Sequence, residues 1–138
     1  MVLNLDSLKK AIAVLGRSLS VFEKHKTDAD KDMQETIRSG VIQNFEVTYE
    51  QCWKMIKRWL ENNLGNSTVD GVSRRELFRM SAEHKLIDDV DTWMIYHDAL
   101  NKTSHTYDVQ TAADVFAVAQ SFCIDAEKLL QNIESHND

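Results

Sequence analysis

An apolar stripe at three- and four-residue intervals runs through residues 31–63, and it restricts the fold of this chain more than any other feature. Its members are Ile37, Val41, Phe45, Tyr49, Cys52, Ile56 and Trp59, with Met33, Ile42, Trp53 and Leu60 widening it. This spacing predicts one amphipathic helix. At ~1.5 Å per residue the helix is roughly 50 Å long, more than a compact bundle needs. We therefore expect a kink at Gly40, an overhang, or contact with a second subunit.

Shorter stripes occupy residues 8–22, 77–82, 90–100 and 112–133. Proline is absent and glycine occurs only four times, as expected where helix interiors make up most of a chain. Residues 65–71 form the one clear linker, and Ser73 with Glu76 has the pattern of a capping box. We predict a single domain over residues 1–138, an all-α antiparallel up-and-down four-helix bundle with an extra short helix.

The net charge is −6, which argues against general affinity for nucleic acid. Cys52 and Cys123 lie among apolar residues, so we expect two reduced core thiols. The N-terminus lacks the pattern of a signal peptide, and no run approaches the ~18 apolar residues of a membrane helix. We predict a cytoplasmic location and no membrane partner.

Histidines and aspartates gather in the second half of the chain without the spacing of a metal site. They are His84, His97, His105, Asp88, Asp89, Asp91 and Asp98. The aspartates instead suit the start of a helix, where negative charge meets the positive end of the helix dipole. We expect no metal and no other cofactor.

Three charged residues follow the stripe of the long helix at four-residue steps: Glu46, Glu50 and Lys54. Glu50 and Lys54 have the favourable order for an ion pair. These residues are expected either to form a solvated flank of the bundle or to bind a partner.

Seven hydrogen-bonding side chains occupy residues 101–107, between two predicted helices. His105 titrates near neutral pH and has Ser104, Tyr107 and Asn101 close by in sequence. The segment therefore suits proton transfer. The alternative is a polar turn in which Ser104, Thr106 and Asp108 cap the next helix.

Two ordered stretches resemble the nucleotidyltransferase substrate-binding protein family across about residues 5–133. The first comprises Phe45-Glu46, Tyr49-Glu50 and Trp53-Lys54. The second comprises Leu86-Ile87-Asp88-Asp89, Trp93 and the segment from Asn101 to Tyr107. The resemblance implies a HEPN-type helical bundle, a homodimer, and a separately encoded minimal nucleotidyltransferase as partner. It marks Glu46, Glu50, Lys54, Trp93 and Ser104 as binding residues.

Related HEPN proteins of toxin–antitoxin pairs are metal-independent ribonucleases, with an arginine a few residues before a histidine and often a tyrosine after it. By this resemblance His105 matches the catalytic histidine, Tyr107 the tyrosine that accepts AMP, and Asn101 the polar residue after the arginine. Leu100 occupies the arginine's place. Leucine cannot donate to a phosphate oxygen, so we expect RNA cleavage to be weak or absent.

The resemblance predicts a binding subunit that complexes a minimal nucleotidyltransferase and helps bind its substrate, with a nucleotide or RNA as a further ligand. One alternative is a HEPN ribonuclease toxin that uses His105 and is silenced by AMP transfer to Tyr107. Another is AMP transfer to Tyr107 without any toxin activity.

Overall fold

The computed structural model describes residues 2–103 and 109–137, and within these ranges the chain is helical with no strand. The helices, in chain order, are α1 (Asp6–His25), α2 (Lys31–Leu64), α3 (Asn66–Val69), α4 (Arg74–Glu83), α5 (Val90–Lys102) and α6 (Val109–Ser135). Each of these described helices is too short or too polar to cross a membrane.

The long helix α2 forms as the apolar stripe predicts, and its ends have clear physical causes. The Asp30 side chain accepts hydrogen bonds from the backbone N–H groups of Asp32 and Met33, which caps the first turn. At the other end Gly65 has a φ of 90°, and its N–H donates to the carbonyl of Glu61 over 3.0 Å. Glycine adopts this backbone conformation without steric cost, so the helix stops there.

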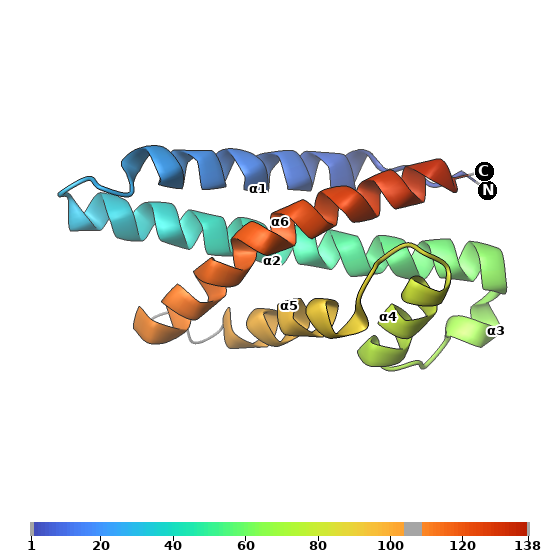
Figure 1. The fold of residues 1–138 in the computed structure, drawn as a ribbon. Helices are drawn as coiled ribbons and strands as arrows, with labels where there is room; N and C mark the ends of the chain where they lie inside the picture. The colour runs from blue at the N-terminus through green and yellow to red at the C-terminus, as the bar shows by residue number, and fades with distance from the viewer. Residues whose placement is uncertain (1, 104–108, 138) are drawn as a thin grey trace.

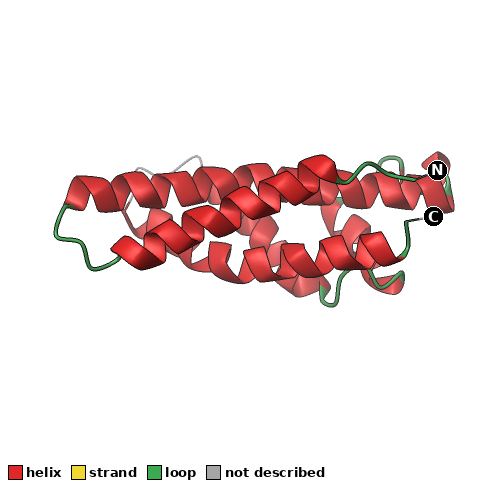
Figure 2. Ribbon diagram, turned by 90° about the horizontal axis from the view of Figure 1, so that it is seen from above, coloured by secondary structure: helices red, strands yellow, loops and turns green. Residues whose placement is uncertain are grey.

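Helices α1, α2, α5 and α6 alternate in direction, which confirms the predicted up-and-down bundle (Figure 1). Helix α1 lies along α2, α6 crosses both obliquely, and α5 runs along another side of α2 (Figures 1 and 2). Helix α2 contacts all the other described helices. The length of α2 is therefore accounted for by its packing against the other helices of the same chain.

The two ends of the chain meet at one end of the bundle (Figure 1). The Leu3 N–H donates to Oδ1 of Asn137 over 2.9 Å, and Nδ2 of Asn137 donates to the Leu3 carbonyl over 3.0 Å. The Trp59 indole N–H donates to the carbonyl of His136, which ties the C-terminus to α2 as well.

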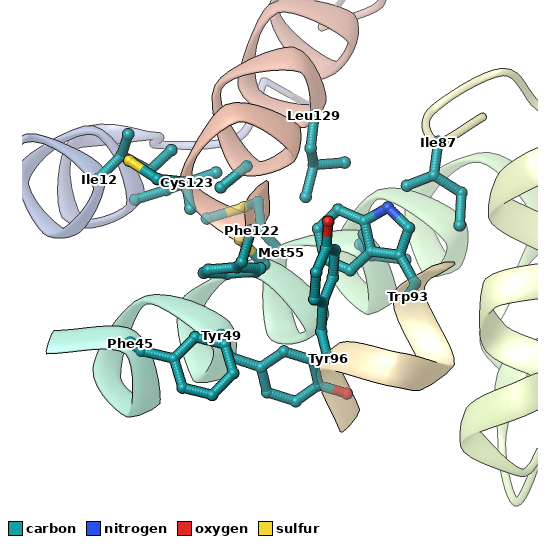
Figure 3. Packing of buried hydrophobic residues seen from close by; sticks show 14 of the residues in the cluster. Ile12, Phe45, Tyr49, Met55, Ile87, Trp93, Tyr96, Phe122, Cys123 and Leu129 are labelled. Carbon is teal, nitrogen blue, oxygen red and sulfur yellow. The ribbon is translucent and has the colours of Figure 1, made fainter. Parts of the chain in front are cut away.

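The core centres on Phe122 of α6, which lies among aromatic rings from α2 and α5 (Figure 3). Phe45 and Tyr96 meet it edge-on, with ring centroids 5.0 and 5.1 Å away, and Trp93 does so at 5.8 Å. Such edge-to-face pairs add to the stabilisation from burial. Both cysteines are buried and free, as predicted.

Two local predictions need correction. The linker over residues 65–71 contains the one-turn helix α3. Of the predicted capping box, only the serine half forms: the Ser73 hydroxyl accepts from the Glu76 N–H, while the Glu76 carboxylate lies 3.4 Å from Arg79. The turn of positive φ at Gly71 then directs the chain into α4.

Candidate functional site

A hydrogen-bonded cluster joins α2, α4 and α5 near the middle of the bundle. Tyr49 of α2 is fully buried, and its hydroxyl lies 3.0 Å from Nδ1 of His97 on α5. Arg74, the first residue of α4, donates from Nη1 to the same hydroxyl over 3.2 Å. The Ser73 cap fixes where α4 begins and so sets the position of this guanidinium.

The chemistry of the three groups fixes the direction of their hydrogen bonds. Arg74 can only donate to the Tyr49 oxygen, so Nδ1 of His97 is the partner left to accept the hydrogen of this buried hydroxyl. His97 is then neutral, with its proton on Nε2. Burial, followed by the positive charge of Arg74, holds the pKa of His97 below its usual range, against the opposing effect of Asp98. Burial also raises the pKa of Tyr49 to about 12, although Arg74 opposes it.

The guanidinium of Arg74 also stacks on an aromatic side chain of α2. Its central carbon lies 3.8 Å from the ring centroid of Trp53 and 5.9 Å from that of Tyr49. A cation over an aromatic face is attracted by the ring's quadrupole. Arg74 forms no ion pair with a carboxylate among the described residues, so its charge is held in place by neutral groups.

Beside this cluster is a pocket of about 300 Å³ between α2, the α3–α4 connection and α5. Its lining combines cationic, polar and apolar side chains: Trp53, Lys57, Val69, Gly71, Val72, Ser73, Arg74, Leu77 and His97. A concave site with a few convergent polar groups on an apolar wall is typical of small-molecule binding.

The charged residues predicted on α2 are not among the residues that line this pocket. Glu50 and Lys54 form the predicted ion pair at 3.5 Å. Lys54 reaches over the Trp53 ring, 5.9 Å from its centroid. Glu46 is partly buried on the same helix. These side chains flank the cluster, and whether they bind a partner stays a prediction.

Of the residues predicted on and after α5, the structure describes Trp93, Leu100 and Asn101. Trp93 is 3% exposed and packs in the core, and Leu100 is partly buried against it. Asn101 is exposed and stands four residues after His97, so the two share a face of α5. Ser104, His105 and Tyr107 lie outside the described residues.

Sequence reasoning missed the cluster in which the Tyr49 hydroxyl joins Arg74 and His97. A signal was present: His97 lies four residues after Trp93 on the apolar side of its helix. A polar side chain in that place needs a hydrogen-bond partner.

No group of three or more metal-binding side chains occurs within residues 2–103 and 109–137.

Comparisons with known proteins agree over nearly the whole chain. Residues 3–135 match the model of a family described as nucleotidyltransferase substrate binding protein like. A Haemophilus influenzae protein named probable ribonuclease HepT is 32% identical over 138 residues, covering 98% of this chain and 94% of that protein.

Two solved structures share the fold. A Haemophilus influenzae structure, described as revealing the fold of a substrate binding domain of a nucleotidyltransferase, aligns with a TM-score of 0.89 and 30% identity. It covers 95% of this chain and 99% of its own. A crystal structure from Thermus thermophilus aligns with a TM-score of 0.72 and 23% identity over 91% and 98% of the two chains, and it supports the fold alone.

Proposed function

Since this chain belongs to the nucleotidyltransferase substrate-binding protein-like family, we propose that it is a binding subunit that complexes a separately encoded minimal nucleotidyltransferase and holds that enzyme's substrate. The family match spans residues 3–135. A relative of 30% identity is described as a substrate binding domain of a nucleotidyltransferase. In this proposal the protein acts as a homodimer in a two-component system of the toxin–antitoxin kind.

One observation within the chain carries the proposal: the charge of Arg74 faces a pocket and no carboxylate among the described residues neutralises it. Burying part of a charged side chain has a cost in free energy unless a partner compensates it. The Trp53 ring and the Tyr49 hydroxyl position the guanidinium, but they do not cancel its charge. Such an arrangement favours an external ligand that supplies the missing negative charge.

The test is complex formation with a minimal nucleotidyltransferase from the same organism. We expect the two purified proteins, mixed at micromolar concentration, to elute together in size-exclusion chromatography and to sediment as one species. Lys54→Met, in a flanking residue that the family resemblance marks for binding, should weaken the complex more than Lys9→Met in α1. Separate elution of the wild-type proteins would contradict the proposal.

A second candidate function is RNA cleavage by His105, with AMP transfer to Tyr107 as its control. The name of the Haemophilus relative, probable ribonuclease HepT, favours it.

The second candidate is tested by incubating the purified protein with mixed-sequence RNA in EDTA. A ribonuclease should lose cleavage in His105→Ala and gain it in Leu100→Arg. AMP transfer should appear in mass spectrometry as one added AMP after incubation with partner and ATP, absent in Tyr107→Phe. Equal cleavage by wild type and His105→Ala would remove this candidate.

A further inference from the structure

The pocket beside Tyr49 has a lining without any carboxylate among the described residues, in a protein with 22 acidic and 16 basic residues. Its two charged side chains are both cations, Lys57 and Arg74. Both are partly buried, and neither forms an ion pair within the described part of the chain. The pocket is therefore a local positive site on a protein of net charge −6.

The remaining polar groups of the lining are also arranged to donate. The Tyr49 hydroxyl occupies Nδ1 of His97, which leaves its Nε2–H as a donor. Arg74 donates one N–H to the Tyr49 hydroxyl, and its other N–H groups lie in the same rigid plane of the guanidinium. Ser73 and Arg74 form the N-terminus of the ten-residue helix α4, where backbone N–H groups and the helix dipole favour an anion.

We propose that this pocket binds the phosphate group of a small phosphate monoester, with Arg74 and Lys57 on the phosphate oxygens. The apolar wall of Val69, Val72 and Leu77 would cover the carbon part of the ligand. This inference deepens the proposed function and rests on it for its setting, since the ligand would be part of the substrate held for the nucleotidyltransferase.

One feature favours a phosphate monoester over a carboxylate, and a second concerns the organic part of the ligand. Two cations and a helix N-terminus together match a group of charge near −2 with several acceptor oxygens better than a single carboxylate. The Arg74 guanidinium already occupies one face of the Trp53 ring, 3.8 Å from its centroid, so a base cannot stack on that face. Recognition therefore depends on the phosphate and tolerates different organic parts.

Isothermal titration calorimetry of the full chain tests the proposal with four probes: AMP, ribose 5-phosphate, inorganic phosphate and adenosine. The pocket variants are Lys57→Gln and Arg74→Gln. Each has a matched control next to it in the sequence, Arg58→Gln and Arg75→Gln, because both control side chains are exposed and outside the lining. Circular dichroism establishes whether each variant is folded. If Arg74→Gln does not fold, Lys57→Gln alone still tests the pocket.

We expect AMP and ribose 5-phosphate to bind with similar affinity, inorganic phosphate to compete with them, and adenosine not to bind. Each pocket variant should weaken binding by about 10- to 100-fold, as expected when a charge-assisted hydrogen bond is lost. The controls should change it less than about twofold. Three results would overturn the proposal: no binding of either ester at millimolar concentration, adenosine binding as well as AMP, or an equal loss in the controls.

The proposed function and this inference fail separately. If the esters do not bind but the nucleotidyltransferase complex forms, only the phosphate pocket is wrong. If the esters bind through Lys57 and Arg74 but no complex forms, the pocket stands and the role as a nucleotidyltransferase subunit is wrong.

Discussion

Replacing Tyr49 by phenylalanine removes one oxygen atom on which both Arg74 and His97 depend. The 3.0 Å bond to the neutral imidazole is worth about 1 kcal/mol and the 3.2 Å bond from the guanidinium about 1.5 kcal/mol. His97 and Arg74 both line the pocket, where water can replace part of the loss. We therefore expect Tyr49→Phe to lower the free energy of unfolding by about 2 kcal/mol.

For a chain of 138 residues the entropy of unfolding is roughly 0.3 kcal/mol per kelvin, so the expected fall in Tm is about 7 °C. Thermal unfolding followed by far-UV circular dichroism measures it. A double-mutant cycle with Arg74→Gln should show coupling of about 1 kcal/mol, because the two changes remove the same bond.

Tyr96→Phe is the matched control for that cycle. It also removes a phenolic hydroxyl from the core, but that hydroxyl donates to Asp125 of α6 rather than contributing to the Arg74 cluster. Its effect should be additive with Arg74→Gln. An unchanged Tm in Tyr49→Phe, or additivity of Tyr49→Phe with Arg74→Gln, would refute the account of the cluster.

Three further predictions concern single side chains. The pKa of His97 is lower in the folded than in the unfolded protein, so its contribution is fully present above about pH 6.5 and is lost as pH falls below that value toward the folded pKa. His97→Asn should flatten urea-measured stability against pH in this window, and parallel curves for variant and wild type would contradict it. Phe122→Ala should cost about 3–5 kcal/mol in urea unfolding, because it empties the centre of the aromatic core; a loss below about 1 kcal/mol would show that the core collapses around the gap. Lys54→Met should change stability by less than about 0.5 kcal/mol, since its ion pair with Glu50 is largely exposed; a larger loss would mean that the cation over Trp53 matters more than the ion pair.

The helices could be predicted from sequence because each carries a long periodic signal. The stripe through residues 31–63 predicted α2 to within one residue of its end at Leu64. The Glu50–Lys54 pair and the Ser73 cap are also local, with partners three or four residues apart. Helix α3 was missed because a single turn of four residues shows no periodicity among polar neighbours.

The cluster could not be predicted in the same way, because its partners are distant in sequence. Tyr49 is 25 residues from Arg74 and 48 from His97, and only the packing of α4 and α5 on α2 brings them together. Sequence periodicity assigns a residue to a face of its own helix, and it does not say which face of another helix lies opposite. Within the part of the chain that the structure describes, Tyr49 and Trp53 are the two members of this cluster that the family resemblance had also selected.

The two hydrogen bonds between Leu3 and Asn137, here called the terminal clasp, join residues 134 positions apart. Nearly the whole chain must therefore be closed into a loop before they can form. Loop-closure entropy increases with the length of chain enclosed, and contacts of short separation form first. The α1–α2 and α5–α6 pairs need much shorter closures. The two chain ends are therefore expected to join after the folding transition state, so weakening the terminal clasp would speed unfolding while leaving the folding rate almost unchanged.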